Sequence, residues 1–427
     1  MPPIDDHPQR YALVNELHAR PFPALSVPCQ AIYLAVKEPL NAANRDRGRD
    51  RTHLLALLDR HGAAHPGPGA THHSARLGKH ELKWESHTEF VTYSAFAPCV
   101  PERPFDPRSA ELFPEDWLAL APGKRIAAVM VRVEPLPDDL GEVTRKLDDW
   151  FVPESLASSW AVDEAAIIAG DFQIDPAGLM RFAVFVRPGT GKRRIGRIVQ
   201  RLCEIETYRA MSMLGLGRAR DLTVRLNALD PQLAGLVSAL TDDHKAAEAT
   251  LHELLEISAE LESLATLHSF RFGATGAYEA IANQRIEVLR ETRLQGRQTF
   301  GEFMRRRYDP AMRTVKSAER RLEQMAERAE RAGELLRTRV DVERSAQNQK
   351  LLESMDRRAD LALRLQHTVE GLSVVAISYY AVSLASYALL PLAEAAHLQK
   401  SLLTAILVPV VVGAVSLMIR RIRRSVH

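Results

Sequence analysis

The stretch that decides the fold is Gln366–Leu392, "QHTVEGLSVVAISYYAVSLASYALLPL". From Val369 to the end of this stretch, the one charged residue is Glu370, at the entrance. A second run, Ser401–Ile419 ("SLLTAILVPVVVGAVSLMI"), contains no charge. A helix crosses a hydrocarbon core of about 30 Å with roughly 20 residues, so each run is long enough. We therefore expect a two-helix transmembrane hairpin; the alternative is a buried helical hairpin of a soluble protein.

The charges around these runs predict an orientation. The connecting residues, 393–400, offer one basic side chain, Lys400. Arginines precede the first run and follow the second, at Arg357, Arg358, Arg364, Arg420, Arg421, Arg423 and Arg424. The positive-inside rule then places both termini in the cytoplasm. The first residues show no apolar core of signal-peptide length, and the three cysteines are far apart, which agrees with a reducing compartment.

A long stalk helix is expected ahead of the first run, over residues 311–368. Pro310 can begin a helix, and the helix would extend about 80 residues, on the order of 120 Å at 1.5 Å per residue. Apolar residues alternate in steps of three and four, as in a coiled-coil seam, at Val315, Ala318, Leu322, Met325, Ala329, Ala332 and Leu336. A second register follows at Leu352, Met355, Ala359, Ala362 and Val369. Residues 337–350 almost lack a seam, so packing should loosen there.

Residues 189–310 are predicted to form helices that buttress the stalk. Two amphipathic segments, Asp242–His268 and Gly276–Arg307, carry apolar residues on one stripe. Between them lies "SFRFGATG" (269–276), which predicts a short turn and hence an antiparallel helix pair.

Residues 1–188 alternate strand-like and helix-like patterns. Strands are predicted at Cys29–Lys37, Lys124–Glu134, Glu164–Asp175 and Leu179–Pro188, with a hairpin over Ser74–Ala97 that turns near Ser86. Helices are predicted at Arg51–His61, Ser109–Leu120 and Asp138–Trp150. The fold class is therefore an α+β domain with a mixed, largely antiparallel sheet, followed by the stalk and the membrane hairpin.

Few residues suggest catalytic chemistry. A formal net charge of +2 gives no case for nucleic-acid binding. "RPGTGKRRIG" (187–196) fails the phosphate-loop pattern, because Val186 replaces its first glycine and Arg193 its hydroxyl. Seven histidines fall within a short segment: His53, His61, His65, His72, His73, His80 and His87. His61 and His65 have a metal-compatible spacing, but neighbouring glycine and proline favour a mobile polar loop. We expect no enzyme and no cofactor, with a metal-dependent activity of this segment as a minor alternative.

The first membrane run carries the remaining candidate residues. Hydroxyl side chains lie near one helical face at Ser373, Tyr380, Ser383 and Tyr387. Glu370 stands at the inner mouth and Glu394 at the outer end. Two hypotheses follow: these hydroxyls bond between helices of a bundle, or they line a pore repeated around an oligomer.

Two stretches carry a family resemblance, "HPQRYALVNELHARPFPAL" (7–25) and "LLESMDRRADLALRLQHTVEGLSVVAISYY" (351–380). They resemble an uncharacterised family of bacterial membrane-anchored proteins, domain of unknown function 3422, along the whole chain. The resemblance implies anchoring in the bacterial inner (cytoplasmic) membrane and supplies no activity.

The predicted layout is also similar, at the level of architecture, to the CorA superfamily of divalent-cation transporters. Those proteins have a cytoplasmic α/β domain, buttressing helices, a long stalk helix and two membrane helices, and they assemble as pentamers with the first membrane helix lining the pore. Their Gly-Met-Asn signature is absent here, where "YALLPLAEAA" (387–396) stands instead. The resemblance therefore implies a homo-oligomer in the lipid bilayer, with divalent cations as possible cargo and no inherited metal selectivity.

The leading functional prediction is an oligomeric, two-pass membrane protein that moves cations through a pore of first membrane helices. The alternative is a membrane-anchored scaffold or sensor, whose cytoplasmic domain binds a partner and whose hairpin serves as an anchor.

Overall fold

The computed structural model describes residues 4–11, 13–14, 21–40, 42–239, 247–395 and 400–426, with the side chains of 390, 392–400 and 422–426 left out. The chain forms two compact units. The first comprises residues 1–242 and 252–332, and the second comprises residues 243–251 and 333–427.

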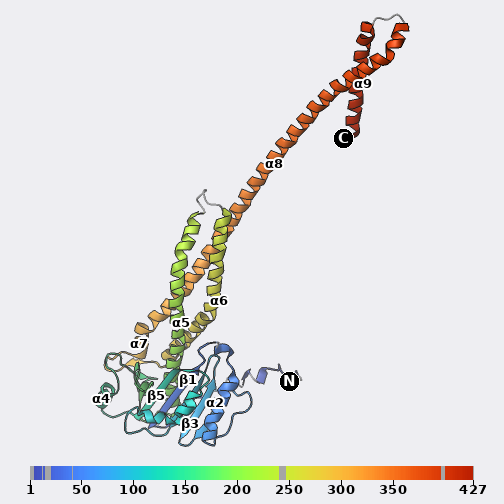
Figure 1. The fold of residues 1–427 in the computed structure, drawn as a ribbon. Helices are drawn as coiled ribbons and strands as arrows, with labels where there is room; N and C mark the ends of the chain where they lie inside the picture. Colours follow the sequence, from blue (N-terminus) through green and yellow to red (C-terminus); the bar gives the residue numbers. More distant parts are fainter. Residues whose placement is uncertain are drawn as a thin grey trace. The chain divides into compact units, whose positions relative to one another are not determined.

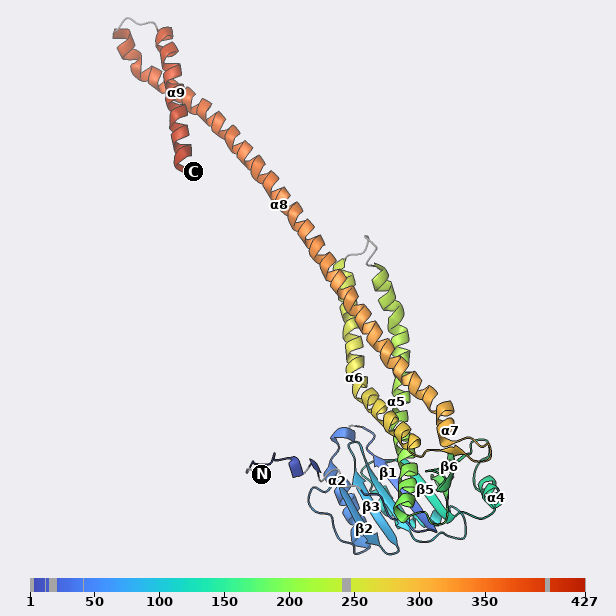
Figure 2. The same cartoon turned by 180° about the vertical axis from the view of Figure 1, so that it is seen from behind.

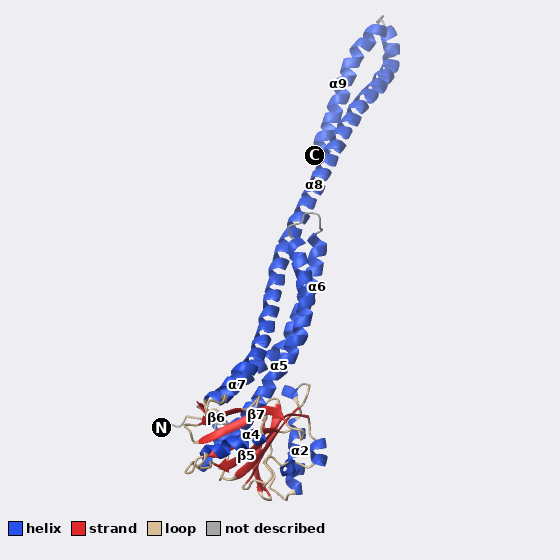
Figure 3. Ribbon diagram, turned by 90° about the vertical axis from the view of Figure 1, so that its left-hand side faces the viewer, coloured by secondary structure: helices blue, strands red, loops and turns tan. Residues whose placement is uncertain are grey.

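The first unit is built on one nine-stranded sheet with the order β2-β3-β4-β1-β5-β8-β7-β6-β9 (Figure 3). Its strands are β1 (Cys29–Lys37), β2 (His72–Leu77), β3 (His80–Ser86), β4 (Phe90–Ala97), β5 (Lys124–Pro135), β6 (Ala157–Ala161), β7 (Ala166–Ile174), β8 (Met180–Val186) and β9 (Thr292–Arg293). Within the described strands, β5 and β8 run parallel and the other neighbouring pairs run antiparallel. The predicted mixed, largely antiparallel sheet is confirmed.

Helices cover both faces of this sheet, which explains why its central strands are apolar on both sides. One face packs against the short helices α2 (Arg47–Arg60), η2 (Pro107–Leu112), α3 (Glu115–Ala119) and α4 (Leu140–Trp150). Alternate residues of β1, such as Ile32 and Leu34, point into that core. The opposite face packs against the beginning of α5 (Lys192–Ala239), where Ile198, Val199 and Leu202 are fully buried.

Three helices continue the first unit side by side: α5, α6 (Ala247–Glu287) and the first part of α8 (Asp309–Ala395), with the short α7 (Phe300–Arg307) before it (Figures 1 and 2). Ion pairs join them, since Arg321 and Arg328 of α8 both contact Asp230 of α5, at 3.1 and 3.0 Å. The first predicted seam is buried here, at Val315, Ala318, Leu322, Met325, Ala329 and Ala332. In this unit the first seam packs against other helices of the same chain, so its burial does not require a second copy of the protein.

The long stalk helix is confirmed, because α8 runs without interruption from Asp309 to Ala395. The predicted turn over residues 269–276 is wrong, since α6 passes through it as helix. Glycine costs about 1 kcal/mol in a helix interior, and tertiary packing offsets this cost. Thr275 lies so close to Gly215 of α5 that a side chain at Gly215 would collide with it. The antiparallel partners are therefore α5 and α6, rather than the two halves of α6.

Several smaller predictions also change. The segment from Ser74 contains three strands, because a turn at Gly78, with φ of +58°, separates β2 from β3. The helix predicted over 109–120 is divided, since Pro114 supplies no amide hydrogen and caps α3. The short strands β6 and β9 were not predicted. The histidine-rich segment is no mobile loop, because most of its histidines lie in α2, β2 and β3.

His53 is the clearest example of a histidine with a structural role. It is buried, and its ring stacks on Trp117 with the centroids 3.9 Å apart. Nε2 lies 2.9 Å from the Trp117 carbonyl oxygen, and Nδ1 lies 2.8 Å from the hydroxyl of Tyr93. A carbonyl can only accept, so Nε2 carries the hydrogen and Nδ1 accepts from Tyr93. Burial lowers the pKa of His53, an effect partly offset by the hydrogen bond to Trp117.

This environment predicts acid destabilisation. The pKa of His53 is lower in the folded state than the usual value of about 6.5, so the unfolded chain binds the proton more tightly. The contribution of His53 is fully present above about pH 6.5 and is lost as the pH falls, at up to about 1.4 kcal/mol per pH unit. Unfolding of the full chain, followed by tryptophan fluorescence between pH 7 and 5, measures it. His53→Asn should flatten the pH dependence, whereas the exposed-site control His61→Asn should not; equal slopes in all three proteins would contradict this role.

Candidate functional site

Two helical stretches of the second unit have the length and composition of membrane spans. They are the apolar end of α8, up to Leu389, and residues Ser401–Arg421 within α9 (Lys400–Val426). Only 6% of each apolar window is buried, unlike the core helix of a soluble protein. The chain therefore carries two candidate membrane-spanning helices, and the prediction of a buried hairpin loses support.

The predicted pore-lining residues fall into two groups. Tyr380 and Tyr387 are 67% and 72% exposed, on a face of α8 that no described residue covers. Ser373, Ser383 and Glu370 are half-buried. Gln366 Nε2 donates to Oε1 of Glu370 at 3.1 Å. Glu394 lies in the last turn of α8, and its side chain is outside the described part.

A different set of serines faces the hairpin interior. α9 turns back along the apolar part of α8 (Figures 1 and 3), and Ser378 of α8 and Val415 of α9 are buried. Among described atoms, the hydroxyls of Ser378 and Ser386 have no hydrogen-bond partner. These two serines were not singled out from the sequence. The contact between α8 and α9 therefore uses other side chains and leaves the two tyrosines uncovered.

One continuous stripe connects the stalk to the tyrosines. Starting at Leu352, uncharged residues follow in strict alternation of three and four along α8. We call this stripe the α8 seam: Leu352, Met355, Ala359, Ala362, Gln366, Val369, Ser373, Ala376, Tyr380, Ser383 and Tyr387. Every member up to Val369 is exposed, while charged residues such as Asp356 and Arg357 occupy the flanks. A heptad seam of this kind is the surface that a partner helix buries.

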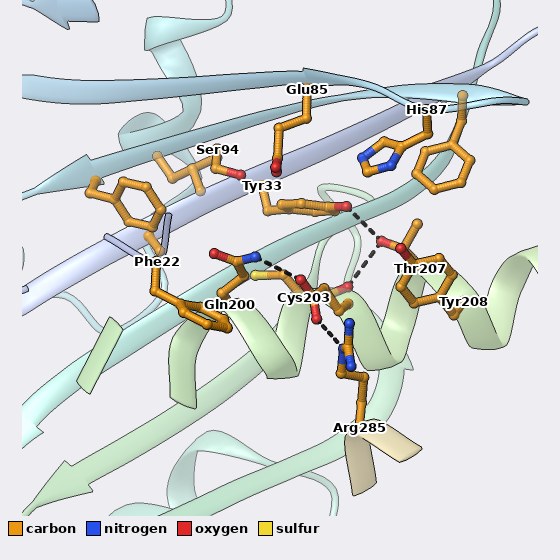
Figure 4. A pocket seen from close by; sticks show the side chains of 15 residues that line it. Phe22, Tyr33, Glu85, His87, Ser94, Gln200, Cys203, Thr207, Tyr208 and Arg285 are labelled. Atoms are coloured by element: carbon orange, nitrogen blue, oxygen red, sulfur yellow. Dashed lines mark hydrogen bonds and ion pairs between the residues drawn. The ribbon is translucent and has the colours of Figure 1, made fainter. Parts of the chain in front are cut away.

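The first unit contains a cavity of about 210 Å³ between the sheet and α5 (Figure 4). Side chains from β1, β3 and β4 form one wall, and side chains from α5 and α6 form the other. The labelled residues of Figure 4 are Phe22, Tyr33, Glu85, His87, Ser94, Gln200, Cys203, Thr207, Tyr208 and Arg285. Strand alternation places Glu85 here, because its neighbours Trp84 and Leu82 point into the core on the opposite face.

Polar contacts fix the side chains around this cavity. The Lys83 ammonium lies 3.2 Å from Oε1 of Glu85 and donates to Oε1 of Gln200 at 3.2 Å. Gln200 Nε2 in turn donates to Glu204 at 2.7 Å, and Arg285 pairs with the other oxygen of Glu204. These contacts hold the α5 side chains against β3 in one arrangement.

The thiol and the phenol of this cavity are not activated. Burial raises the pKa of Cys203 and of Tyr33 well above their usual ranges. Cys203 is therefore a neutral thiol near pH 7, not a nucleophilic thiolate. In the described part of the chain, no three His, Cys, Asp or Glu side chains are placed to hold a metal ion. The geometry of this cavity suits binding rather than covalent chemistry.

A buried ionic cluster lies close to the cavity. Glu89 accepts hydrogen bonds from Arg271 and from the Tyr278 hydroxyl, the latter at 3.1 Å, and the Lys37 ammonium is 3.8 Å away. Burial lowers the pKa of Lys37, and Arg271 lowers it further. Through these contacts of Glu89, the cluster joins α6 to the sheet.

A family model described as "Protein of unknown function (DUF3422)" matches residues 5–426. The chain belongs to this family. A search of curated proteins found no match. The expected family resemblance is confirmed over nearly the whole chain, and the description of the family names no activity.

Only weak signals for this cavity are present in the sequence. In "HELKWES" (80–86), polar residues alternate with apolar ones, the usual pattern of a strand with one solvent face. That face is instead covered by α5, where Gln200, Glu204 and Thr207 recur at helical spacing. The polar face of β3 and the polar face of α5 come together only in the folded chain. The cavity between them therefore could not be predicted from the sequence.

Proposed function

We propose that the protein is a two-pass inner-membrane protein whose α8 helices assemble around a cation-conducting pore. The observation that carries this proposal is the α8 seam, which continues in one register from the charged stalk to Tyr387. The proposal places both termini in the cytoplasm, because basic residues flank both outer ends of the hairpin.

The exposed part of the seam needs a partner in water. Leu352 and Met355 are each 65% exposed, and burying such a side chain stabilises an assembly by about 1.5–3 kcal/mol. Further along, the seam changes to Ser373, Ala376 and Ser383, small residues of the kind that let helices approach closely in lipid. The α8 seam can therefore pack against the same partner helix along its whole length, both in water and in the lipid.

A second copy of α8 is the partner that fits this pattern. An identical helix carries the same seam in the same register and is held in the same membrane plane. The 3.5-residue repeat also favours a left-handed supercoil of like helices. Assembly of several copies would bring Tyr380 and Tyr387 together, giving rings of hydroxyl groups in an otherwise apolar span.

Glu370 supports a preference for cations. Its carboxylate lies one residue after Val369 of the seam, where the predicted span begins. Copies around an axis would form a carboxylate ring at the inner mouth, which attracts cations and repels anions. The layout expected from the sequence resembles that of the CorA superfamily, and this resemblance motivates the proposal at the level of architecture alone.

The cavity of the first unit favours a second candidate function. A membrane-anchored sensor would bind a ligand in this cavity, and the hairpin would serve as its anchor. Ion flux across a membrane distinguishes the two functions, because an anchor conducts nothing.

The pore proposal predicts ion flux that depends on the seam. Purified full-length protein in liposomes should pass cations, and Tyr380→Ala should change the flux severalfold because a ring of hydroxyls is removed. Tyr379→Ala, the adjacent exposed tyrosine outside the seam, is the matched control and should behave as the wild type. Liposomes that remain tight to mono- and divalent cations would exclude the pore and favour the sensor.

Selectivity supplies a separate prediction. Glu370→Gln removes the negative charge and keeps the side-chain shape, so the ratio of cation to anion permeability should fall severalfold. Reversal potentials in planar bilayers measure this ratio under a salt gradient. Glu353→Gln, on the exposed stalk outside the seam, serves as the control. An unchanged permeability ratio in Glu370→Gln would show that this carboxylate is not part of the conduction path.

A further inference from the structure

We propose that a second cavity of the first unit, between the sheet and the segment η2–α3, binds a carboxylate that carries a medium-length alkyl chain. Tyr33 of β1 shares a hydrogen bond with Thr207 of α5, at 2.9 Å. Its neighbours alternate to the other face of the sheet, where Ile32, Leu34 and Val36 line this cavity. The inference goes beyond the membrane function and does not depend on it, because the residues that line the cavity belong to the first unit.

Apolar side chains form most of the wall opposite the sheet. We call this space the η2–α3 cavity, and from that segment its wall includes Ala110, Phe113, Leu118, Ala119 and Ala121. Leu120 is 73% exposed, so apolar surface continues beside the cavity. The volume is about 650 Å³, within the range of small-molecule sites. At about 30 Å³ per water molecule, it has room for roughly twenty non-hydrogen atoms, more than a ten-carbon acid requires.

Strand pairing places an arginine at one end of the η2–α3 cavity. A register shift after Ala35 brings Arg125 of β5 opposite Val36 of β1. Residues directly opposite each other in an antiparallel pair point to the same face, so Arg125 shares the face of Val36 and lines the cavity. Ile32 lies four positions back along β1, a distance of about 13 Å. The cavity is therefore elongated along β1, with a guanidinium near Val36.

The guanidinium of Arg125 is held in place without an acidic partner. It packs against the turn between β7 and β8, so closely that a Cβ atom at Gly178 would collide with it. Gly178 has φ of +81°, a conformation that favours glycine. In the part of the chain that the structure describes, Arg125 has neither a hydrogen bond nor an ion pair. Arg125 is exposed at the cavity mouth, and its planar group can bind a carboxylate through two parallel hydrogen bonds.

Two carboxylates also line the cavity, Glu111 and Glu115, and neither pairs with Arg125. Glu111 and Ile32 line a neighbouring cavity as well, together with Arg108. Glu111 therefore belongs to the Ile32 end, where Arg108 interacts with it electrostatically. Glu115 lies in the first turn of α3. The separation of Glu111 from Arg125 favours a ligand whose carboxylate is at Arg125 and whose alkyl chain extends toward Ile32.

The test compares ligands that share a ten-carbon chain and differ in the head group. Isothermal titration of the full-length protein in detergent uses decanoate, decanol and decylamine, and the heat of each ligand in protein-free detergent is subtracted. Decanoate should bind at least about fivefold more tightly than the other two, because its head group alone accepts charge-assisted hydrogen bonds from Arg125 as an anion. Butyrate should bind at least about tenfold more weakly than decanoate, because it buries less apolar surface.

The same titrations can overturn the proposal. Absence of decanoate binding up to millimolar concentration would do so. Equal or tighter binding of decylamine would show that the glutamates, rather than Arg125, select the ligand. Equal or tighter binding of decanol would exclude recognition of the charge, and equal or tighter binding of butyrate would exclude recognition of the chain.

Two substitutions then locate the ligand. Arg125→Gln removes the cation and should weaken decanoate binding about fivefold or more. Ala110→Leu should weaken it by a similar factor, because the larger side chain occupies space that the alkyl chain requires. The matched control is Arg220→Gln, at an exposed position of α5, which should bind decanoate as the wild type does. Melting curves check that the variants are folded, and unchanged affinity in either folded cavity variant would refute the assignment.

Discussion

Along α8, the described residues leave a long apolar surface uncovered, and the other features of the second unit depend on it. In the second unit, Leu352, Met355 and their neighbours along α8 are exposed, and so are Tyr380 and Tyr387. The hydrophobic effect makes such exposure in water costly. Two surroundings can cover it, a bilayer around the apolar runs and another helix along the α8 seam. The same constraint therefore predicts both membrane insertion and self-association.

α8 meets this constraint differently along its length. Its first seam, from Val315 to Ala332, is buried beside α5 and α6 of the same chain. The second seam, from Leu352 to Tyr387, has no such neighbour among the described residues of its unit. Residues 337–350 separate the two registers, so one continuous helix buries one seam inside its own chain and leaves the stalk part of the other exposed. This division would let the sheet and its bundle fold independently of assembly.

Much of the architecture followed from local sequence patterns. The strands β1, β5, β7 and β8 were predicted because each is a short apolar run between turn signals. α8 was predicted because proline and glycine are almost absent from it. Errors arose where tertiary contacts override local preference, as at Gly273 and Gly276 inside α6. The predicted domain boundaries, including the one at residue 188, stay predictions; in the structure, α5, most of α6 and the first part of α8 belong with the sheet.

The hydroxyl-bearing face of α8 and the cavity of the first unit also differ in how well the sequence predicts them. The face with Tyr380 and Ser383 was visible from helical spacing alone, because one helix carries all of it. The cavity at Glu85 was not visible, because it joins residues 85 and 204 from different elements and pairs two polar faces that the sequence presents as solvent-facing. Contacts between elements that lie far apart in the sequence, rather than the types of residue, were the part that could not be predicted.

The most direct test of the account is disulfide cross-linking along α8 in native membranes. Ala362→Cys lies in the seam and Leu361→Cys lies beside it, and both positions are exposed in a single chain. Cys99→Ser removes the exposed native thiol from the background. Mild oxidation should give covalent dimers of Ala362→Cys and few or none of Leu361→Cys. Monomers for both variants, or equal cross-linking of both, would contradict self-association through the α8 seam.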